Sequence, residues 1–179
     1  MNLSEAHQLQ GELANQSETK RIAIIGAGVI GDPVSIPWLI QMMGIPEIAR
    51  IAGESFTMIT GVDIACEDLE GEWPEGFEAG PTESPEDEDV EMDTDEDLPW
   101  PEPALIQDWW KKNSNRFKNG THYLLGKPIT YENLQQVLKN GRQRQRYTAA
   151  LELTLMQPGQ PLFEVRAPGY RQKQLLGLK

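Results

Sequence analysis

A glycine pattern is the feature of this sequence that could carry chemistry. Gly26-Ala-Gly28-Val-Ile-Gly31 follows the apolar run Ile22–Ile25. In dinucleotide-binding folds, glycines with this spacing lie between a strand and a helix, and the pyrophosphate binds at the N-terminus of that helix. Under this interpretation, Gly26, Gly28 and Gly31 would form the cofactor site of a nucleotide-dependent oxidoreductase.

The residues that follow the pattern argue against a nucleotide site. Pro33 would fall in the first turns of the required helix, where proline removes a backbone donor and clashes with the preceding turn. Asp32 would place a negative charge beside the phosphates. The acid that binds ribose should end a second strand about 20 residues later, but residues 47–54 have helical spacing. We therefore expect no cofactor and keep the oxidoreductase as an alternative.

The same stretch also fits a run of helices. Asp32 suits the N-cap of a helix, and Pro33 suits its first position. Apolar residues then recur every three or four positions along one helix face, at Ile36, Leu39, Ile40 and Met43. Of the neighbouring helices, one is predicted to begin after Ser17 and to include Ile22–Ile30, and the other to span residues 46–60. Because the turns between them are short, consecutive helices should pack antiparallel.

These helices should share one core. Their spacing predicts that four apolar side chains meet between consecutive helices: Trp38, Ile40, Ile51 and Ile59.

Residues 30–40 (IGDPVSIPWLI) resemble a HEAT repeat of the short bacterial kind. Further segments resemble a bacterial HEAT-repeat family of uncharacterised function: Ala49–Phe56, Ile59–Asp63, Trp109–Trp110, Gly141–Arg146, Ala149–Leu153 and Arg166–Gly169. Proteins of that family are proteobacterial and are often encoded near type VI secretion components. They tend to be longer, and this chain resembles their C-terminal half. The resemblance implies a helical adaptor, chaperone or immunity factor.

Charge is distributed very unevenly. Residues 51–110 contain no Lys or Arg, and residues 67–102 hold 17 acids. From Lys111 onward, 13 bases stand against three acids. The acidic run has too few apolar residues to offset the entropy of ordering, so we predict a mobile insertion in which residues 80–98 are dispensable for folding.

We therefore predict an all-α protein, a short α-solenoid of HEAT-like antiparallel repeats, with one or two short strands. Its parts would be HEAT-like repeats over residues 1–66, the acidic insertion over 67–102, and a C-terminal helical subdomain over 103–179. In the last part, Thr130 is suited to cap a helix over residues 131–140, and the next helix should span 142–156.

The charged regions supply the candidate partner-binding residues. They are Arg142, Arg144 and Arg146 in the basic third, and Glu86, Asp87, Glu88 and Asp89 in the acidic run. We predict a protein partner, and that the acidic run transiently covers the surface that carries Arg142 and Arg146. Because the tethered acids would compete for these arginines, we do not expect nucleic acid to bind. A nucleic-acid binder that uses the basic third stays as an alternative.

No set of residues predicts catalysis or a metal site. His7 and His122 lack metal-ligand spacing, and the acidic neighbours of Cys66 disfavour a reactive thiolate. We therefore expect a protein that is not an enzyme. The sequence has no run of about 18 apolar residues that would predict a membrane span. The single cysteine and the N-terminal sequence favour the cytoplasm.

Overall fold

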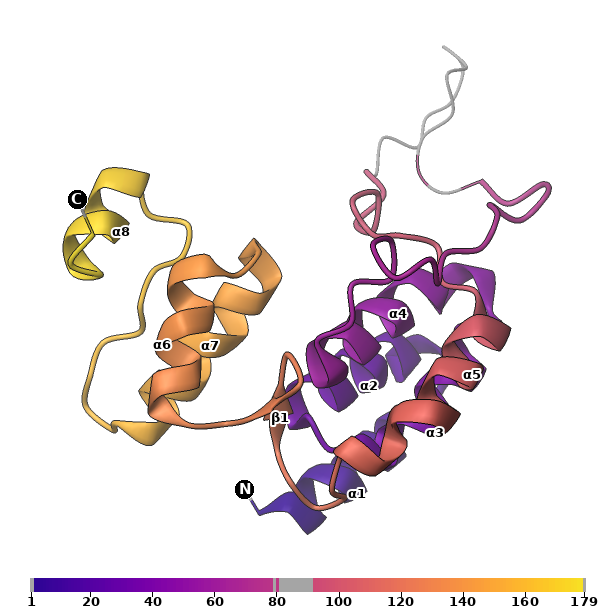
Figure 1. The fold of residues 1–179 in the computed structure, drawn as a ribbon, viewed down its shortest axis with the longest axis horizontal. Coiled ribbons are helices and arrows are strands. Elements are labelled where there is room, and N and C mark those ends of the chain that lie inside the picture. Colours follow the sequence, from indigo (N-terminus) through magenta and orange to yellow (C-terminus); the bar gives the residue numbers. More distant parts are fainter. Residues whose placement is uncertain (1, 79, 81–91, 179) are drawn as a thin grey trace. The chain divides into compact units, whose positions relative to one another are not determined.

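The computed structural model describes residues 2–78, 80 and 92–178 of the chain. The chain divides into two compact units, residues 1–126 and residues 127–179 (Figure 1). Helices dominate the described residues, and their one sheet pairs the two-residue strands β1 (Tyr123–Leu124) and β2 (Lys127–Pro128). The prediction of a mostly helical protein with short strands is confirmed, whereas the HEAT-repeat arrangement stays a prediction.

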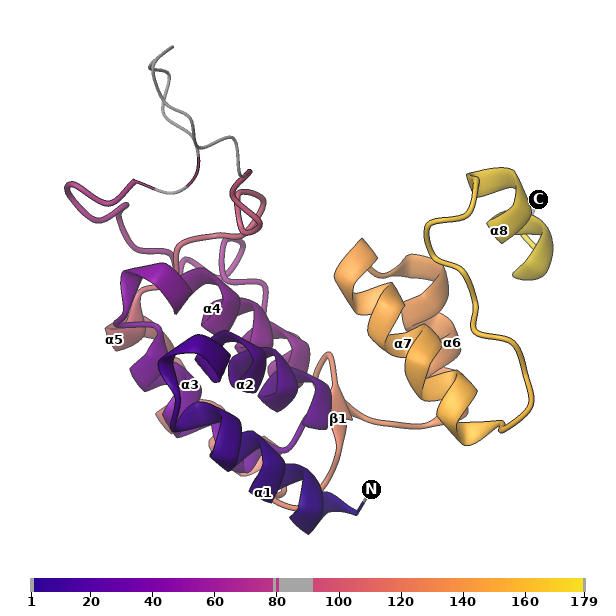
Figure 2. The ribbon, with the colours of Figure 1, turned by 180° about the vertical axis from the view of Figure 1, so that it is seen from behind.

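Besides β1, the described residues of the first unit form five α-helices and two 3-10 turns. In chain order they are α1 (Leu3–Ala14), α2 (Ser17–Ile30), η1 (Pro33–Ser35), α3 (Ile36–Met42), α4 (Pro46–Thr60), α5 (Pro103–Asn113) and η2 (Ser114–Arg116). Helix α2 packs on both α1 and α4, and α3 packs on α4 and α5. Figure 2 shows α1, α2 and α3 from the side opposite to Figure 1. The prediction that Ile22–Ile30 is helical is confirmed.

Helix α4 is the centre of the hydrophobic core, because most of its residues are buried. Phe56 and Ile59 of α4 are fully buried beside Ile24 of α2. The prediction of a shared core is confirmed: Ile40, Ile51 and Ile59 belong to one cluster, and Trp38 packs against it.

Two glycines end α2 and α4 in the left-handed conformation and let a later part of the chain approach closely. Gly31 has φ of 67° and Gly61 has φ of 75°. A Cβ on Gly31 would collide with the carbonyl oxygen of Tyr123, and one on Gly61 would collide with the backbone of Leu125. The Tyr123 N–H donates to the Gly31 carbonyl at 2.9 Å. The ends of α2 and α4 therefore hold the β1 segment by its backbone.

Helix α5 belongs to the first unit, so the division of the chain differs from the predicted boundary at residue 103. Ile106 is fully buried in the core. The Trp109 ring meets the Phe56 ring edge to face, with centroids 5.6 Å apart. Because the apolar face of α5 is buried by α3 and α4, the division comes after Gly126.

The acidic segment is closed at its base by its own two ends. Glu70 and Pro101 form an antiparallel bridge. The Gly71 N–H donates to the Trp100 carbonyl, and the Glu102 N–H donates to the Leu69 carbonyl, both at 2.9 Å. The predicted mobile insertion is therefore fixed at its two ends. Residue 79 and residues 81–91 lie outside the described part.

The second unit contains α6 (Tyr131–Asn140), α7 (Gln143–Met156) and α8 (Gly169–Leu175). Helices α6 and α7 pack on each other. The Thr130 hydroxyl caps α6 by accepting from the Asn133 N–H at 3.2 Å, as the sequence predicted. In the part of the chain that the structure describes, no helix is both long and apolar enough to cross a membrane.

Candidate functional site

The glycines of the nucleotide-like pattern have structural roles in helix α2. Ile22–Ile25, which a dinucleotide fold requires as a strand, lie inside the helix. A Cβ on Gly28 would come within 3.0 to 3.1 Å of Ser55 of α4, so this glycine allows α2 and α4 to approach closely. Gly31 ends the helix. The strand–turn–helix geometry that holds a pyrophosphate is therefore missing at this motif.

The three arginines predicted to bind a partner do not form one exposed cluster. Arg142 is exposed at the N-cap of α7, whereas Arg144 and Arg146 are half-buried. The Arg146 guanidinium donates to the Leu138 carbonyl at 2.8 Å and to the Gln172 side-chain oxygen. Gln172 in turn donates to the Val165 carbonyl at 2.9 Å. Arg146 therefore connects α6 and α7 to α8, and it is committed to the fold of the second unit.

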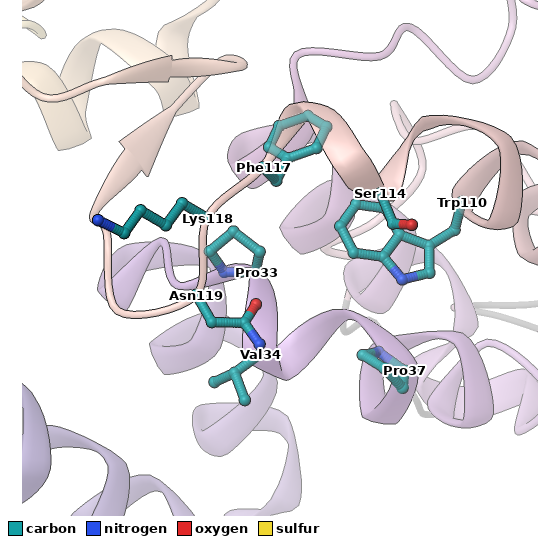
Figure 3. Close-up of a pocket in the computed structure, with 8 residues that line it drawn as sticks. All are labelled: Pro33, Val34, Pro37, Trp110, Ser114, Phe117, Lys118 and Asn119. Carbon is teal, nitrogen blue, oxygen red and sulfur yellow. The ribbon is translucent and has the colours of Figure 1, made fainter.

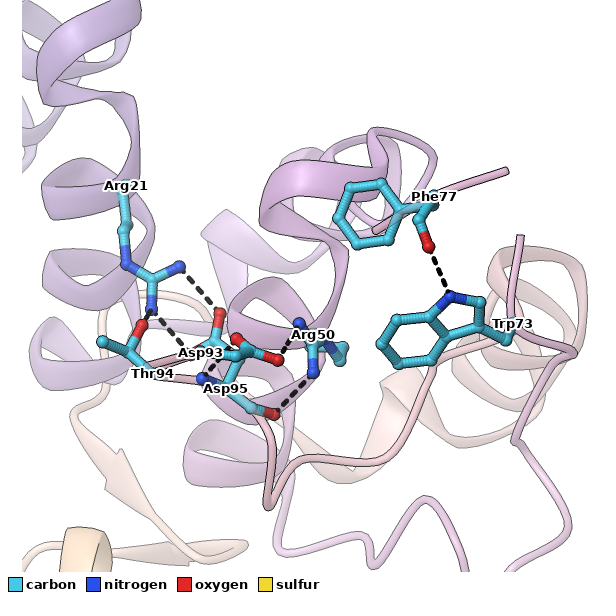
Figure 4. Close-up of polar contacts among 7 residues, drawn as sticks. All are labelled: Arg21, Arg50, Trp73, Phe77, Asp93, Thr94 and Asp95. Atoms are coloured by element: carbon cyan, nitrogen blue, oxygen red, sulfur yellow. Dashed lines mark hydrogen bonds and ion pairs between the residues drawn. The ribbon is translucent and has the colours of Figure 1, made fainter. Parts of the chain in front are cut away.

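The predicted acidic partners Glu86, Asp87, Glu88 and Asp89 lie outside the described residues. Asp93 to Asp95, which follow them in the sequence, are held by two arginines that are not among the predicted partner-binding residues (Figure 4). The Arg21 guanidinium donates to both carboxylate oxygens of Asp95, at 2.6 and 2.7 Å. Arg50 forms an ion pair with Asp93 at 2.8 Å.

The arginine latch is made of Arg21, Arg50, Asp93 and Asp95. Its Arg50 and Asp95 side chains are buried, whereas the Arg21 side chain is 35% exposed. Arg50 is 5% exposed and Asp95 is 4% exposed. Arg50 also donates to the Asp95 carbonyl at 2.9 Å. Burial alone would raise the pKa of Asp93, but hydrogen bonds from the Asp95 N–H and from Arg50 lower it overall. The hydrogen bond to Asp95 raises the pKa of Arg21. Both charges are thus stabilised where they lie.

Two tryptophans of the acidic segment complete the surroundings of Arg50. The guanidinium carbon lies 5.0 Å from the Trp73 ring centroid and 5.5 Å from that of Trp100. Trp73 donates from its indole nitrogen to the Phe77 carbonyl at 2.8 Å. The predicted mobility of residues 80–98 therefore does not hold for Asp93 and Asp95. Arg50 joins both sides of the acidic segment to α4 through charge and cation–π contacts.

The first unit has a groove with a volume of about 660 Å³ (Figure 3). We call it the α3–α5 groove. Its lining is mostly apolar and carries one charged side chain, with contributions from Pro33, Val34, Pro37, Trp110, Phe117 and Lys118. It lies between the turn that starts α3 and the residues that end and follow α5.

The floor of this groove is rigid because it continues into the core. The Trp110 and Phe117 rings lie 5.4 Å apart, and Phe117 meets the buried Tyr123 ring at 5.3 Å. Trp110 and Phe117 both pack against the core cluster. On the opposite wall, Val34 is 49% exposed. The groove thus offers an open apolar surface whose shape is already formed.

Asp32 connects the two walls of the groove. Its carboxylate accepts from the Val34 N–H on one wall and from the Gly120 N–H on the other, in both cases at 3.1 Å. His7 of α1 is its third partner, at 3.0 Å. Burial would raise the pKa of Asp32, but these hydrogen bonds lower it overall. The residue predicted as a simple cap therefore also fixes the distance between the walls.

The described residues contain no group of three or more His, Cys, Asp or Glu side chains that could hold a metal ion. Cys66 is exposed, and His7 is occupied by Asp32.

The sequence contains a signal for Arg50 but none for the groove. Arg50 interrupts the apolar stretch Ala49–Ala52, and a basic residue on a buried face requires a partner. The groove brings together residues 33–37 and 110–119, which no local spacing connects. In comparisons with known proteins, no family model, no curated protein and no solved structure matches the chain.

Proposed function

We propose that the chain is a non-catalytic protein-interaction module of the HEAT-repeat type, which binds a partner protein through the α3–α5 groove. The observation that carries the proposal is the groove itself. It combines a preformed apolar floor of Trp110 and Phe117 with the exposed Val34. Exposed apolar surface of this kind is typical of an interaction site.

The walls of the groove suit a binding role because their shape is fixed before a partner arrives. Pro33 and Pro37 lack backbone donors and have a restricted φ. Asp32 fixes Val34 relative to Gly120. A preformed surface loses little conformational entropy when it binds, so a larger part of the contact energy remains as affinity.

The cellular setting of the proposal rests on the sequence resemblance alone. The resemblance supports an adaptor, chaperone or immunity factor linked to bacterial type VI secretion. The nucleotide-dependent oxidoreductase has less support, because Gly28 and Gly31 serve helix packing and helix termination.

The test is in-cell cross-linking of the tagged full chain, followed by mass spectrometry, for the wild type and two matched variants. Val34→Gln replaces an exposed apolar side chain of the groove. Ile22→Gln replaces one on α2 that is 55% exposed and does not line the groove. We expect specific cross-linked proteins with the wild type and Ile22→Gln, and their loss with Val34→Gln. The groove assignment is wrong if all three chains yield the same proteins, and the interaction module is wrong if none yields any.

A further inference from the structure

Most basic residues of the first unit outside the arginine latch belong to the stretch of sequence that supplies one wall of the α3–α5 groove. Residues 1–126 contain 25 acids and only seven bases. Arg21 and Arg50 are paired within the arginine latch. Four of the other bases fall within eight residues: Lys111, which pairs with Asp108 at 3.0 Å, and Lys112, Arg116 and Lys118. The same stretch supplies Phe117 and Lys118 to the groove lining. A unit that is strongly acidic overall therefore has a locally basic edge at its apolar groove.

Lys118 is the charged side chain that the groove itself presents. It is exposed, and its side chain has no hydrogen bond or ion pair with any residue in the described ranges. Its backbone is nevertheless fixed, because the Lys118 N–H donates to the Tyr123 hydroxyl at 3.1 Å. The ammonium group stands at the end of a flexible four-carbon side chain, which extends away from the other lining residues in Figure 3 and can turn toward a ligand in the groove.

The acid nearest to the groove does not cancel this charge at the surface. The Asp32 side chain is only 3% exposed. Its oxygens already accept from Val34, Gly120 and His7. Because this carboxylate is buried and already hydrogen-bonded, the charge that the groove presents to a ligand is that of Lys118.

We propose that the occupant of the α3–α5 groove is an extended acidic peptide segment of a partner protein, in which an apolar side chain lies next to an Asp or Glu. This inference rests on the proposed function and specifies the partner. The apolar side chain would lie on Trp110 and Phe117, and the carboxylate would pair with Lys118. An aromatic- and proline-lined groove suits extended segments, whose apolar side chains enter it one at a time.

The overall charge of the unit favours a short acidic segment over a long polyanion. Residues 1–126 carry a net charge of −18. A nucleic acid would meet this repulsion along its whole length. A peptide with one or two carboxylates is attracted by the local basic edge. Because it is short, it contacts little of the surrounding acidic surface.

The test is selection of a phage-displayed library of random twelve-residue peptides on the full chain, followed by affinity measurement of the enriched peptides by isothermal calorimetry. We expect enriched sequences to combine apolar residues with Asp or Glu. Lys118→Glu should weaken their binding about three- to tenfold, because an attraction becomes a repulsion. Lys139→Glu, an exposed lysine of α6, is the matched control and should leave binding unchanged.

A charge-swap experiment completes the test. Replacing the acid of an enriched peptide by lysine should restore part of its affinity for Lys118→Glu while weakening its binding to the wild type. The inference is overturned if no peptide is enriched, if the enriched peptides lack acids, or if Lys118→Glu leaves their affinity unchanged. Partner proteins that cross-link in a Val34-dependent manner would still support the proposed function in each of these cases.

Discussion

Two sets of arginines lie in opposite electrostatic surroundings and have different roles. Arg21 and Arg50 belong to a unit with a net charge of −18, and they hold the acidic segment at Asp93 and Asp95. Arg146 belongs to the basic unit, and the partners found for it there are neutral, among them the Leu138 carbonyl and the Gln172 side chain. The charge density along the sequence instead predicted that the acidic run covers the surface that carries Arg142 and Arg146.

Burial and geometry, rather than the density of charge along the sequence, therefore determine which residues form ion pairs. Arg50 is 5% exposed on a helix that forms the core, so a missing counter-charge there would be costly. The ion pairs of exposed arginines contribute little in general. Arg50, a buried base in an acidic unit, therefore requires its acidic partner more strongly than an exposed base does.

Removing Arg50 is expected to give the largest effect. Arg50→Ala leaves the Asp93 carboxylate without its ion pair, removes the donor to the Asp95 carbonyl and exposes faces of Trp73 and Trp100. We expect the free energy of unfolding of the first unit to fall by about 3 kcal/mol. All five tryptophans lie in that unit, so denaturant unfolding followed by tryptophan fluorescence reports on it directly. Arg142→Ala is the control, and an equal loss in both variants would refute the distinction.

Asp32 is a buried acid that also depends on its partners. Removing its charge should lower the free energy of unfolding by less than removing Arg50 does. Asp32→Asn keeps the shape of the side chain but weakens the hydrogen bonds from Val34, Gly120 and His7. We expect a loss of about 1 to 2 kcal/mol near neutral pH.

The pH dependence of that loss has a definite sign. Because the folded-state pKa of Asp32 is lowered, its contribution to stability is present above the unfolded pKa of about 3.9 and disappears as the pH falls through the folded value. The wild type and Asp32→Asn should therefore converge in stability as the medium becomes strongly acidic. A constant difference down to the lowest pH would mean that Asp32 acts without its charge.

The sequence predicted those features of the fold that local spacing determines. The helical stripe of α3 and the cap at Thr130 both follow from residues within one or two turns of each other. The shared core of Ile40, Ile51 and Ile59 followed because short turns force neighbouring helices together.

The latch and the groove could not be predicted in the same way, because both join distant segments. Asp95 meets Arg21 across 74 positions, and Gly120 meets Asp32 across 88. The many acids of the segment also offered no local reason to select Asp93 and Asp95 over Glu86 or Asp87. Their selection depends on which carboxylates reach Arg21 and Arg50 in the folded chain.

Removing Arg146 should produce a smaller and more local change than removing Arg50. Arg146→Ala loses the donors to the Leu138 carbonyl and to Gln172. We expect a loss of about 1 kcal/mol confined to the second unit. Amide hydrogen exchange should accelerate in α8, while tryptophan fluorescence unfolding stays unchanged. A shifted fluorescence transition would show that Arg146 also supports the first unit.

The smallest expected effect concerns residues 81–91, which contain the predicted partner residues Glu86 to Asp89. Replacing them with a Gly/Ser linker keeps Asp93 and Asp95 on the arginine latch, so the tryptophan unfolding midpoint should stay within a few degrees. If these acids shield the basic unit, the deletion should expose salt-sensitive binding to a polyanion such as heparin, and Arg142→Ala should weaken that binding. The effect is expected to be modest, because Arg146 is already committed to Gln172 and few arginines remain for the ligand. Equal heparin affinity for the intact and deleted chains at about 50 mM salt would show that the acids do not shield Arg142.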